Sequence, residues 1–242
     1  MRPMDSGMAQ LGTLHVVPVA LADSSRWSGA ELRDVVGGIS DWIVETPKVA
    51  RAQLRSIQPS LDLNALNMAS WSKHGGNDAK SLLEACRQGR DMGLISDAGA
   101  PGMADPGAEV VAQAHAEGIP VVAWPGPSSF LLGLMSSGLG GQQFRFHGYL
   151  PHEANVRKSQ VLRMERDAVQ GESQWFIETP YRNAKLFPEL CQMLHPDTEL
   201  YIGLGLTGPR EWVRRHSVRT WRSMPLPKEL NEKEPAIWAI GR

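Results

Sequence analysis

Two loops of small residues are the strongest candidates for a binding site in this chain. Residues 94–107 (LISDAGAPGMADPG) and 121–130 (VVAWPGPSSF) each begin as a short apolar run and continue in Gly, Ala, Pro and Ser. In an open α/β sheet, ligands bind at loops that follow the carboxyl ends of strands. Small side chains let the backbone approach a ligand, and free N–H groups at a helix start can contact its polar atoms. We expect a ligand site here, the alternative being tight turns that only connect strands to helices.

Acidic residues in and near the first loop allow two interpretations. Asp97, Asp105 and Glu109 together have the oxygen ligands that a hard cation such as Mg²⁺ prefers. Alternatively, Asp105 caps a helix that starts at Pro106, because aspartate accepts the first free N–H groups and proline tolerates the first turn. We favour capping and expect no metal. The sequence also lacks the Walker loop, the dinucleotide-binding glycine motif and zinc-ligand spacings.

Two further groups of residues are candidates for catalysis or for ligand binding. Glu178 follows an apolar run and precedes Thr179-Pro180, which predicts a carboxylate at a strand end. It can serve as a general base or form a salt bridge to Arg182, and both interpretations remain open. Residues 210–222 contain five arginines against one glutamate, a pattern that can neutralise phosphates or form a solvated face.

The elements that must position these residues alternate between strand and helix. In the first part of the chain the apolar pattern predicts strands at 14–19, 40–45, 92–96 and 121–124, with helices between them and an ambiguous segment at 61–68. This spacing favours a parallel sheet with right-handed crossovers. After residue 150 a second, smaller sheet is predicted from strands near 174–178, 200–204, 211–218 and 236–240. We therefore expect two α/β domains, 13–150 and 151–242, with a strand at 144–151 closing the first.

Bulk composition agrees with a soluble globular protein. The 242 residues are 42% hydrophobic and 21% charged, with a formal net charge of -1, so no global field indicates nucleic acid. The two cysteines, Cys86 and Cys191, are far apart, which is typical of a reducing compartment. There is no apolar run long enough to span a bilayer. These features predict a cytoplasmic protein without a membrane partner.

The motifs together resemble the tetrapyrrole methylase superfamily. The resemblance is carried by 96–107 (SDAGAPGMADPG), 125–128 (PGPS), 148–151 (GYLP) and 178–182 (ETPYR), and covers nearly the whole chain in matching order. The branch that contains the small-subunit ribosomal RNA cytidine 2′-O-methyltransferase is the most similar. The resemblance implies S-adenosylmethionine (SAM) as methyl donor, two α/β domains with the donor in the cleft between them, and a homodimer.

Carried over by position, the resemblance also implies which residues contact the donor. The first domain contributes mainly small residues: Pro18, Ala98, Gly99, Ala100, Met103, Ala104, Ser128 and Ser129. The second contributes a strand end and a glycine-containing segment: Glu178, Thr179, Gly203, Leu204, Gly205 and Leu206. For a hydroxyl acceptor a base is needed, and Glu178, Asp97 and Glu45 are our candidates in that order.

The methyl acceptor is less well defined than the donor. The ribosomal RNA branch typically has a Pro-Ile-Gly-Asn-Leu loop after the first strand and Glu-Asp-Thr-Arg after the second. This chain has 18–22 (PVALA) and 45–48 (ETPK) instead. Three hypotheses follow: methylation of ribosomal RNA ribose, methylation of a small or tetrapyrrole-like acceptor, or a catalytically idle module that binds SAM.

Overall fold

A computed structural model describes residues 10–22, 27–71 and 78–242 of the chain. The chain separates into two compact units, the first ending at Ser128 and the second comprising Ser129–Arg242. Each unit has its own five-stranded sheet and its own hydrophobic core. The two-sheet α/β fold expected from the sequence is confirmed.

The first unit is built on a parallel sheet. Its strands, in the spatial order β3-β2-β4-β1-β5, all pair in the parallel sense, as the alternating pattern predicts. The strands are β1 (Leu14–Val16), β2 (Asp41–Val44), β3 (Asn67–Ser70), β4 (Met92–Ile95) and β5 (Val121–Ala123). The ambiguous segment at 61–68 contains a short 3-10 turn, Leu63–Ala65, and then the start of β3.

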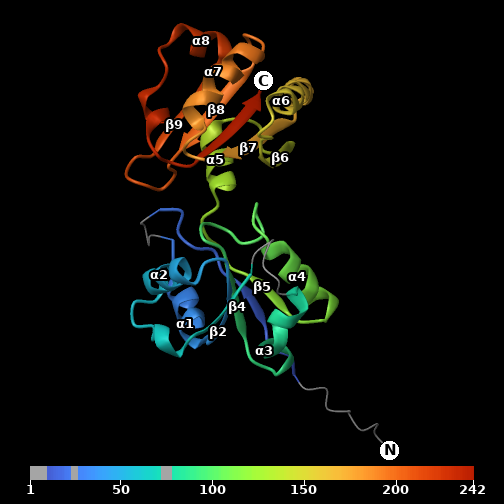
Figure 1. The fold of residues 1–242 in the computed structure, drawn as a ribbon, viewed down its shortest axis with the longest axis vertical. Helices are drawn as coiled ribbons and strands as arrows, with labels where there is room; N and C mark the ends of the chain where they lie inside the picture. Colours follow the sequence, from blue (N-terminus) through green and yellow to red (C-terminus); the bar gives the residue numbers. More distant parts are fainter. Residues whose placement is uncertain (1–9, 23–26, 72–77) are drawn as a thin grey trace, which may run out of the picture. The chain divides into compact units, whose positions relative to one another are not determined.

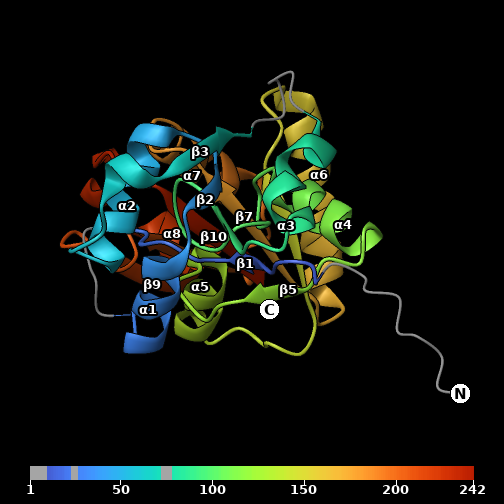
Figure 2. The same cartoon turned by 90° about the horizontal axis from the view of Figure 1, so that it is seen from below.

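Helices cover both faces of this sheet. Figures 1 and 2 both show α1 (Ala30–Gly38) and α2 (Pro47–Ile57) on one side, and α3 (Glu84–Arg87) and α4 (Gly107–Ala116) on the other. A separate cluster of buried side chains lies under each pair of helices. This is the usual result of right-handed crossovers between parallel strands. From the sequence alone, Asn77 is a candidate cap for the helix before β4, but it lies outside the described residues. Asp78 caps a 3-10 turn, Ala79–Leu83, that leads into α3.

The second unit has a mixed sheet in the order β6-β7-β10-β8-β9. Strands β6 and β7 are parallel, and the remaining neighbours are antiparallel. The strands are β6 (Phe144–Tyr149), β7 (Ser173–Glu178), β8 (Glu199–Leu204), β9 (Trp212–Ser217) and β10 (Ala236–Gly241). The helices are α5 (Ser129–Ser137), α6 (Ala154–Val169), α7 (Asn183–Met193) and α8 (Val218–Ser223), and a 3-10 turn spans Lys228–Asn231.

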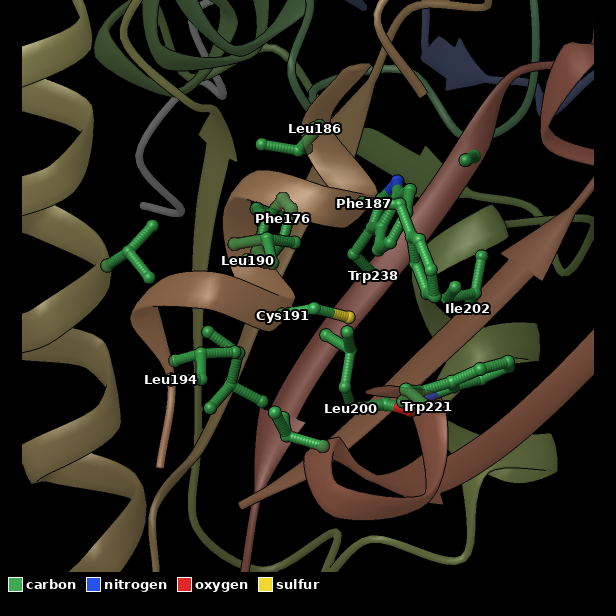
Figure 3. Close-up of a cluster of buried hydrophobic side chains, with 14 of the residues drawn as sticks. Phe176, Leu186, Phe187, Leu190, Cys191, Leu194, Leu200, Ile202, Trp221 and Trp238 are labelled. Carbon is green, nitrogen blue, oxygen red and sulfur yellow. Dashed lines mark hydrogen bonds between the residues drawn. The ribbon is translucent and has the colours of Figure 1, made fainter. Parts of the chain in front are cut away.

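The larger core of the second unit lies between its sheet and helices α6, α7 and α8. Figure 3 shows Phe176 and Trp238 from the sheet facing Phe187 and Leu190 of α7, with Trp221 of α8 closing the cluster. The opposite face of the sheet packs against α5 through Trp175 and Tyr201. Both faces are therefore buried, which fixes the alternation of side chains along β7 and β8.

The expected domain boundary at residue 150 is wrong. Strand β6 pairs with β7 in the second sheet, and the division falls at Ser128, before α5. The reason is aromatic packing, because the Phe130 ring of α5 lies 5.1 Å from that of Phe144 and 5.6 Å from that of Trp175, between ring centroids. A short apolar strand fits either sheet by pattern alone, and these contacts decide which sheet it joins.

Candidate functional site: the small-residue loops and their supports

The loops after β1 and β4 are joined by a backbone bridge. The Val19 N–H donates to the Gly99 carbonyl at 2.9 Å, and the Gly99 N–H donates to the Val19 carbonyl at 3.2 Å. Gly99 has a φ of 75°, a conformation that side chains with a Cβ rarely adopt. The bridge places Pro18 on one loop of the first unit and Ala98, Gly99 and Ala100 on the adjoining loop. These four residues are among those that the resemblance implies for the donor site.

A second connection joins the ends of β2 and β4 through Asp97. Its carboxylate accepts hydrogen bonds from the Thr46 backbone N–H at 3.1 Å and from the Thr46 hydroxyl at 2.8 Å. In return the Asp97 N–H donates to Glu45 Oε2 at 2.8 Å. Gln53 of α2 adds two longer bonds, from Nε2 to the Ala20 carbonyl at 3.3 Å and to the Asp97 carbonyl at 3.4 Å. The loops after β1, β2 and β4 are thus connected by side chains as well as by the backbone bridge between Val19 and Gly99.

Asp105 serves the start of α4 much as its position before Pro106 predicts, but the N-cap residue is Pro106 and the helix begins one residue later than expected, at Gly107. Its carboxylate accepts from the Gly102 N–H at 2.8 Å and from the Gly107 N–H, at the first residue of α4, at 2.7 Å. Among the described residues, no group of three or more His, Cys, Asp or Glu side chains is arranged to hold a metal ion. Asp105 therefore closes its own loop and starts the helix.

Glu45 lies in an environment that disfavours its charge. Burial raises the pKa of Glu45 above its usual value; the hydrogen bond from Asp97 lowers it, and the charges of Asp97 and Asp105 raise it. The carboxyl lines a cavity of about 10 Å³ beside Ser96 and Asp105, which is room for about one water molecule. Partial burial and the neighbouring carboxylates therefore favour the protonated form of Glu45.

Trp71 belongs to the core rather than to a substrate surface. Its side chain is 7% exposed and its indole N–H donates to the Pro106 carbonyl at 2.9 Å. The polar, glycine-containing sequence of residues 70–77 (SWSKHGGN) predicts an exposed loop, with Trp71, Lys73 and His74 as candidates to touch a substrate. This prediction does not hold for Trp71. Lys73 and His74, named with it, lie outside the described residues.

The loop after β5 closely approaches the loop after β1. A Cβ added to Gly126 would lie 2.5 Å from Pro18 Cβ and 3.3 Å from the Trp27 ring. The Trp27 indole N–H is buried and finds no acceptor among the described residues. Further along, the Ser128 hydroxyl contacts Met103 Sδ at 3.5 Å. The loop carrying Met103 also contains Ala104, whose φ is 63°.

The second unit presents its own predicted positions at the ends of β7 and β8. The Glu178 side chain is fully buried, and its Oε1 accepts from the Thr179 N–H at 2.7 Å. Its Oε2 lies 3.3 Å from Arg182 Nε as an ion pair, yet receives no hydrogen bond. The salt-bridge interpretation is therefore what the structure shows, and one buried acceptor of this carboxylate is left without a hydrogen-bond donor.

The segment after β8 offers backbone rather than side chains. Leu204 and Leu206 are buried in the core, and a Cβ at Gly203 would lie 2.6 Å from the Tyr201 hydroxyl oxygen. Gly205 has a φ of 54° and donates its N–H to the Pro235 carbonyl at 3.0 Å. A ligand at this segment would meet main-chain groups at Gly203 and Gly205.

The arginines of residues 210–222 are mostly engaged within the second unit. Arg210 pairs with Glu232 and Glu234, and Arg219 pairs with Asp197. Arg215 pairs with Glu199, and Arg222 donates to the carbonyls of Cys191 and Leu194. Arg214 lies 5.7 Å from the Trp212 ring centroid. Because carboxylates and carbonyls of other elements already bind most of these arginines, the structure favours a solvated face over a free phosphate site.

Comparison with known proteins defines the family. The family model of tetrapyrrole (corrin/porphyrin) methylases matches residues 39–220, about three quarters of the chain. The chain belongs to this family. Membership confirms the resemblance and, at the level of the family, the expected enzyme class of SAM-dependent methyltransferases.

Relatives from bacteria support the same assignment, and a solved structure shares the fold. Over 207 residues the chain is 26% identical to the ribosomal RNA small subunit methyltransferase I of Vibrio cholerae, covering 83% of this chain and 67% of the relative. The protein of that name from Mesorhizobium japonicum is 34% identical over 151 residues, 62% of this chain and 50% of the relative. The chain thus spans about half to two thirds of the length of these relatives.

The uroporphyrin-III C-methyltransferase of Thermus thermophilus, solved with S-adenosylhomocysteine, has a TM-score of 0.55 at 15% identity, covering 96% of this chain and 98% of that one.

The family implies SAM as methyl donor, and the residues present fit such a group. In the first unit, the buried Trp27 indole N–H is a donor that finds no acceptor among the described residues, and Gly126 lets two small-residue loops pack so closely that a Cβ would lie 2.5 Å from Pro18 Cβ. In the second unit, Glu178 Oε2 is a buried acceptor that an N–H donor can satisfy.

Sequence reasoning missed Thr46, Gln53 and Trp27. Thr46, directly before a helix-starting proline, was the one that could have been found.

Proposed function

We propose that this chain transfers a methyl group from SAM to small-subunit ribosomal RNA, at a ribose 2′-hydroxyl. The observation that carries the proposal is the name shared by the curated relatives, ribosomal RNA small subunit methyltransferase I. The ribose position follows from the branch resemblance of the motifs at 96–107 and 125–128.

Donor contacts are proposed for the positions inferred from the sequence. In the first unit these are the bridged, small-residue loops: Pro18, Ala98, Gly99, Ala100, Met103, Ala104 and Ser128. In the second unit they are Ser129, Glu178, Thr179, Gly203, Leu204, Gly205 and Leu206. For Leu204 and Leu206 we propose main-chain contacts, because their side chains are buried.

The donor supplies an activated methyl group, and the protein has to align the acceptor and receive its proton. In-line displacement is accelerated mainly by positioning and by exclusion of water. Both oxygens of Asp97 accept from Thr46, so we propose that Asp97 is a positioning residue rather than the base. Glu45 and Glu178 remain the base candidates. Glu45 is favoured because its raised pKa lies in the direction that general-base catalysis requires.

Location and assembly complete the proposal. We propose a cytoplasmic homodimer, in keeping with the family resemblance and the buried, reduced cysteines. None of the helices that the structure describes combines the length and apolar character that a bilayer-spanning helix needs. Light scattering after gel filtration tests the dimer, and a monomeric mass at micromolar concentration would contradict it.

Two measurements test the activity. Calorimetry with SAM comes first, and absence of binding at millimolar donor would remove both methyltransferase hypotheses. Transfer of a labelled methyl group to small ribosomal subunits from a strain that lacks the gene is the second. The label is expected in one ribonucleotide, with the linkage that follows it resistant to alkali. Label in a tetrapyrrole instead, or donor binding without transfer to either acceptor, would favour the alternative acceptor or the idle module.

A further inference from the structure

Helix α2 has an exposed basic face that no part of the described chain neutralises. Lys48, Arg51 and Arg55 are all exposed and lie at positions i, i+3 and i+7, which places them on one stripe of the helix. Ala50, Leu54 and Ile57 form the opposite, buried face. We call the three cations the basic face of α2.

These charges have no counterions in the residues described at 10–22, 27–71 and 78–242. Lys48, Arg51 and Arg55 form no ion pair, and Arg51 makes one long contact, 3.5 Å, to the Pro47 carbonyl of its own helix. The helix, Pro47–Ile57, contains no Asp or Glu. Three like charges on adjacent turns repel one another, a cost that an anionic partner would relieve.

Other basic segments of the chain differ in this respect. The arginines of 210–222 have carboxylate or carbonyl partners in the second unit. Helix α6 also exposes Lys158, Arg163 and Arg166, but it carries Glu165 and Asp167 on the same helix. Of these three described segments, the basic face of α2 is the one without an acidic residue on its own element and without an ion-pair partner.

The start of α2 is attached to the small-residue loops. Thr46, its N-cap residue, is bonded to Asp97, and Gln53 reaches the carbonyls of Ala20 and Asp97. All of these residues belong to the first unit, so their arrangement is internal to one compact body. An anionic chain bound along α2 would end at the loops proposed to hold the methyl donor.

We propose that the basic face of α2 binds consecutive phosphates of the RNA acceptor and leads the strand to the donor loops. The inference rests on the proposed function. From Lys48 to Arg55 the helix rises about 10 Å, which matches about three nucleotides at roughly 3.4 Å per nucleotide along a strand. Lysine and arginine contacts to phosphates fix the position of a nucleic acid without reading its sequence.

The test uses two charge-matched triple variants of the full chain. One is Lys48→Gln, Arg51→Gln, Arg55→Gln, and the control is Lys158→Gln, Arg163→Gln, Arg166→Gln on α6. Binding to deproteinised small-subunit ribosomal RNA is measured between about 50 and 200 mM salt, a range over which phosphate contacts lose affinity steeply. SAM affinity and thermal unfolding are measured for both variants.

The expected result is a selective loss for the α2 variant. Its RNA dissociation constant should rise by about tenfold or more, and its salt slope should fall by about 2, near 0.7 for each lost phosphate contact. SAM affinity and unfolding should stay near those of the parent. A charge-preserving variant, Lys48→Arg, Arg51→Lys, Arg55→Lys, should retain RNA binding.

Other outcomes overturn the proposal. Unchanged RNA binding by the α2 variant, or an equal loss in the α6 variant, would show that this face has no special role while leaving the proposed function standing. A parent chain that binds SAM but no RNA would remove the proposed function itself. Selective loss of binding to phosphatidylglycerol vesicles, with RNA binding intact, would assign the face to a membrane surface instead.

Discussion

The carboxylate of Asp97 receives both the backbone N–H and the hydroxyl of Thr46, at 3.1 and 2.8 Å. The two residues follow adjacent strands, β2 and β4, so the contact fixes the relative position of two loops at one sheet edge. The Thr46 hydroxyl therefore has a structural role, because it helps to hold the loop that follows β4, which we propose to contact the donor. Donor affinity should depend on it although Thr46 is not itself proposed to contact the donor.

Replacement of Thr46 by valine tests that dependence. The variant keeps the shape of the side chain and the backbone bond but loses the hydroxyl donor, at a cost of about 1 kcal/mol in unfolding free energy. We expect the SAM dissociation constant to rise several-fold. The control is Thr198→Val, which removes a similar bond, 2.6 Å from the hydroxyl to Glu165, in the second unit. Equal donor affinity in both variants would contradict the prediction.

Glu45 should give the first unit a distinctive pH dependence. Because its pKa in the folded state is raised above 4.5, the folded protein binds the proton more tightly than the unfolded chain. Its contribution to stability is complete below about pH 4.5 and is lost as pH rises through the folded pKa. The free energy of unfolding, measured in urea at several pH values, should therefore decrease with rising pH more in the parent than in Glu45→Gln.

Glu117 provides the opposite case for that experiment. The hydrogen bond from Arg87 holds the pKa of Glu117 below its usual value. Its contribution is present above about pH 4.5 and is lost as pH falls, so Glu117→Gln should differ from the parent mainly at the higher pH. Identical pH profiles for the two variants would show that the raised pKa of Glu45 is not expressed in solution.

The close approach of Gly126 to Pro18 predicts sensitivity to a single methyl group. In Gly126→Ala the new Cβ would lie 2.5 Å from Pro18 Cβ, so one of the two loops has to move. Such overpacking typically costs about 1–3 kcal/mol. Calorimetry should show weakened SAM binding. Gly38→Ala, where a Cβ meets nothing within 4 Å, should leave binding unchanged.

The buried pair of Glu178 and Arg182 should behave as a coupled unit. The glutamate side chain is 0% exposed and the arginine 21%. Arg182→Met leaves a buried carboxylate without its ion partner, which we expect to cost about 3 kcal/mol of unfolding free energy. Adding Glu178→Gln should recover part of that loss. A double-mutant cycle by urea denaturation measures the coupling, and strict additivity would be evidence against it.

The sequence predicted those features that depend on local pattern. Alternating apolar runs and helices are enough to indicate a parallel sheet with loops at one edge, and Asp105 before Pro106 is enough to indicate a helix cap. Features that depend on distant partners were not accessible. The pairing of Arg210 with Glu232 and Glu234 needs the fold of the second sheet, and so does the assignment of β6 to that sheet.

The candidate site shows the same division. Small residues indicate the loops that we propose to bind the donor, because a close approach of backbone to ligand favours glycine or alanine whatever the remote structure is. The supports of those loops, Thr46 and Gln53, have ordinary side chains whose partners lie 51 and 33 positions away in the sequence. Their role becomes visible when the sheet places the loops side by side.

Strand β10 lies at the centre of the second sheet, between β7 and β8. During translation the first unit can form its sheet before the second has been synthesised, as amino-terminal domains generally do. The second unit has to wait, because β6–β7 and β8–β9 remain separate ribbons until Ala236–Gly241 emerge from the ribosome. A nascent chain stalled before those residues would therefore expose two half-sheets to chaperones and proteases, beside a first unit already folded.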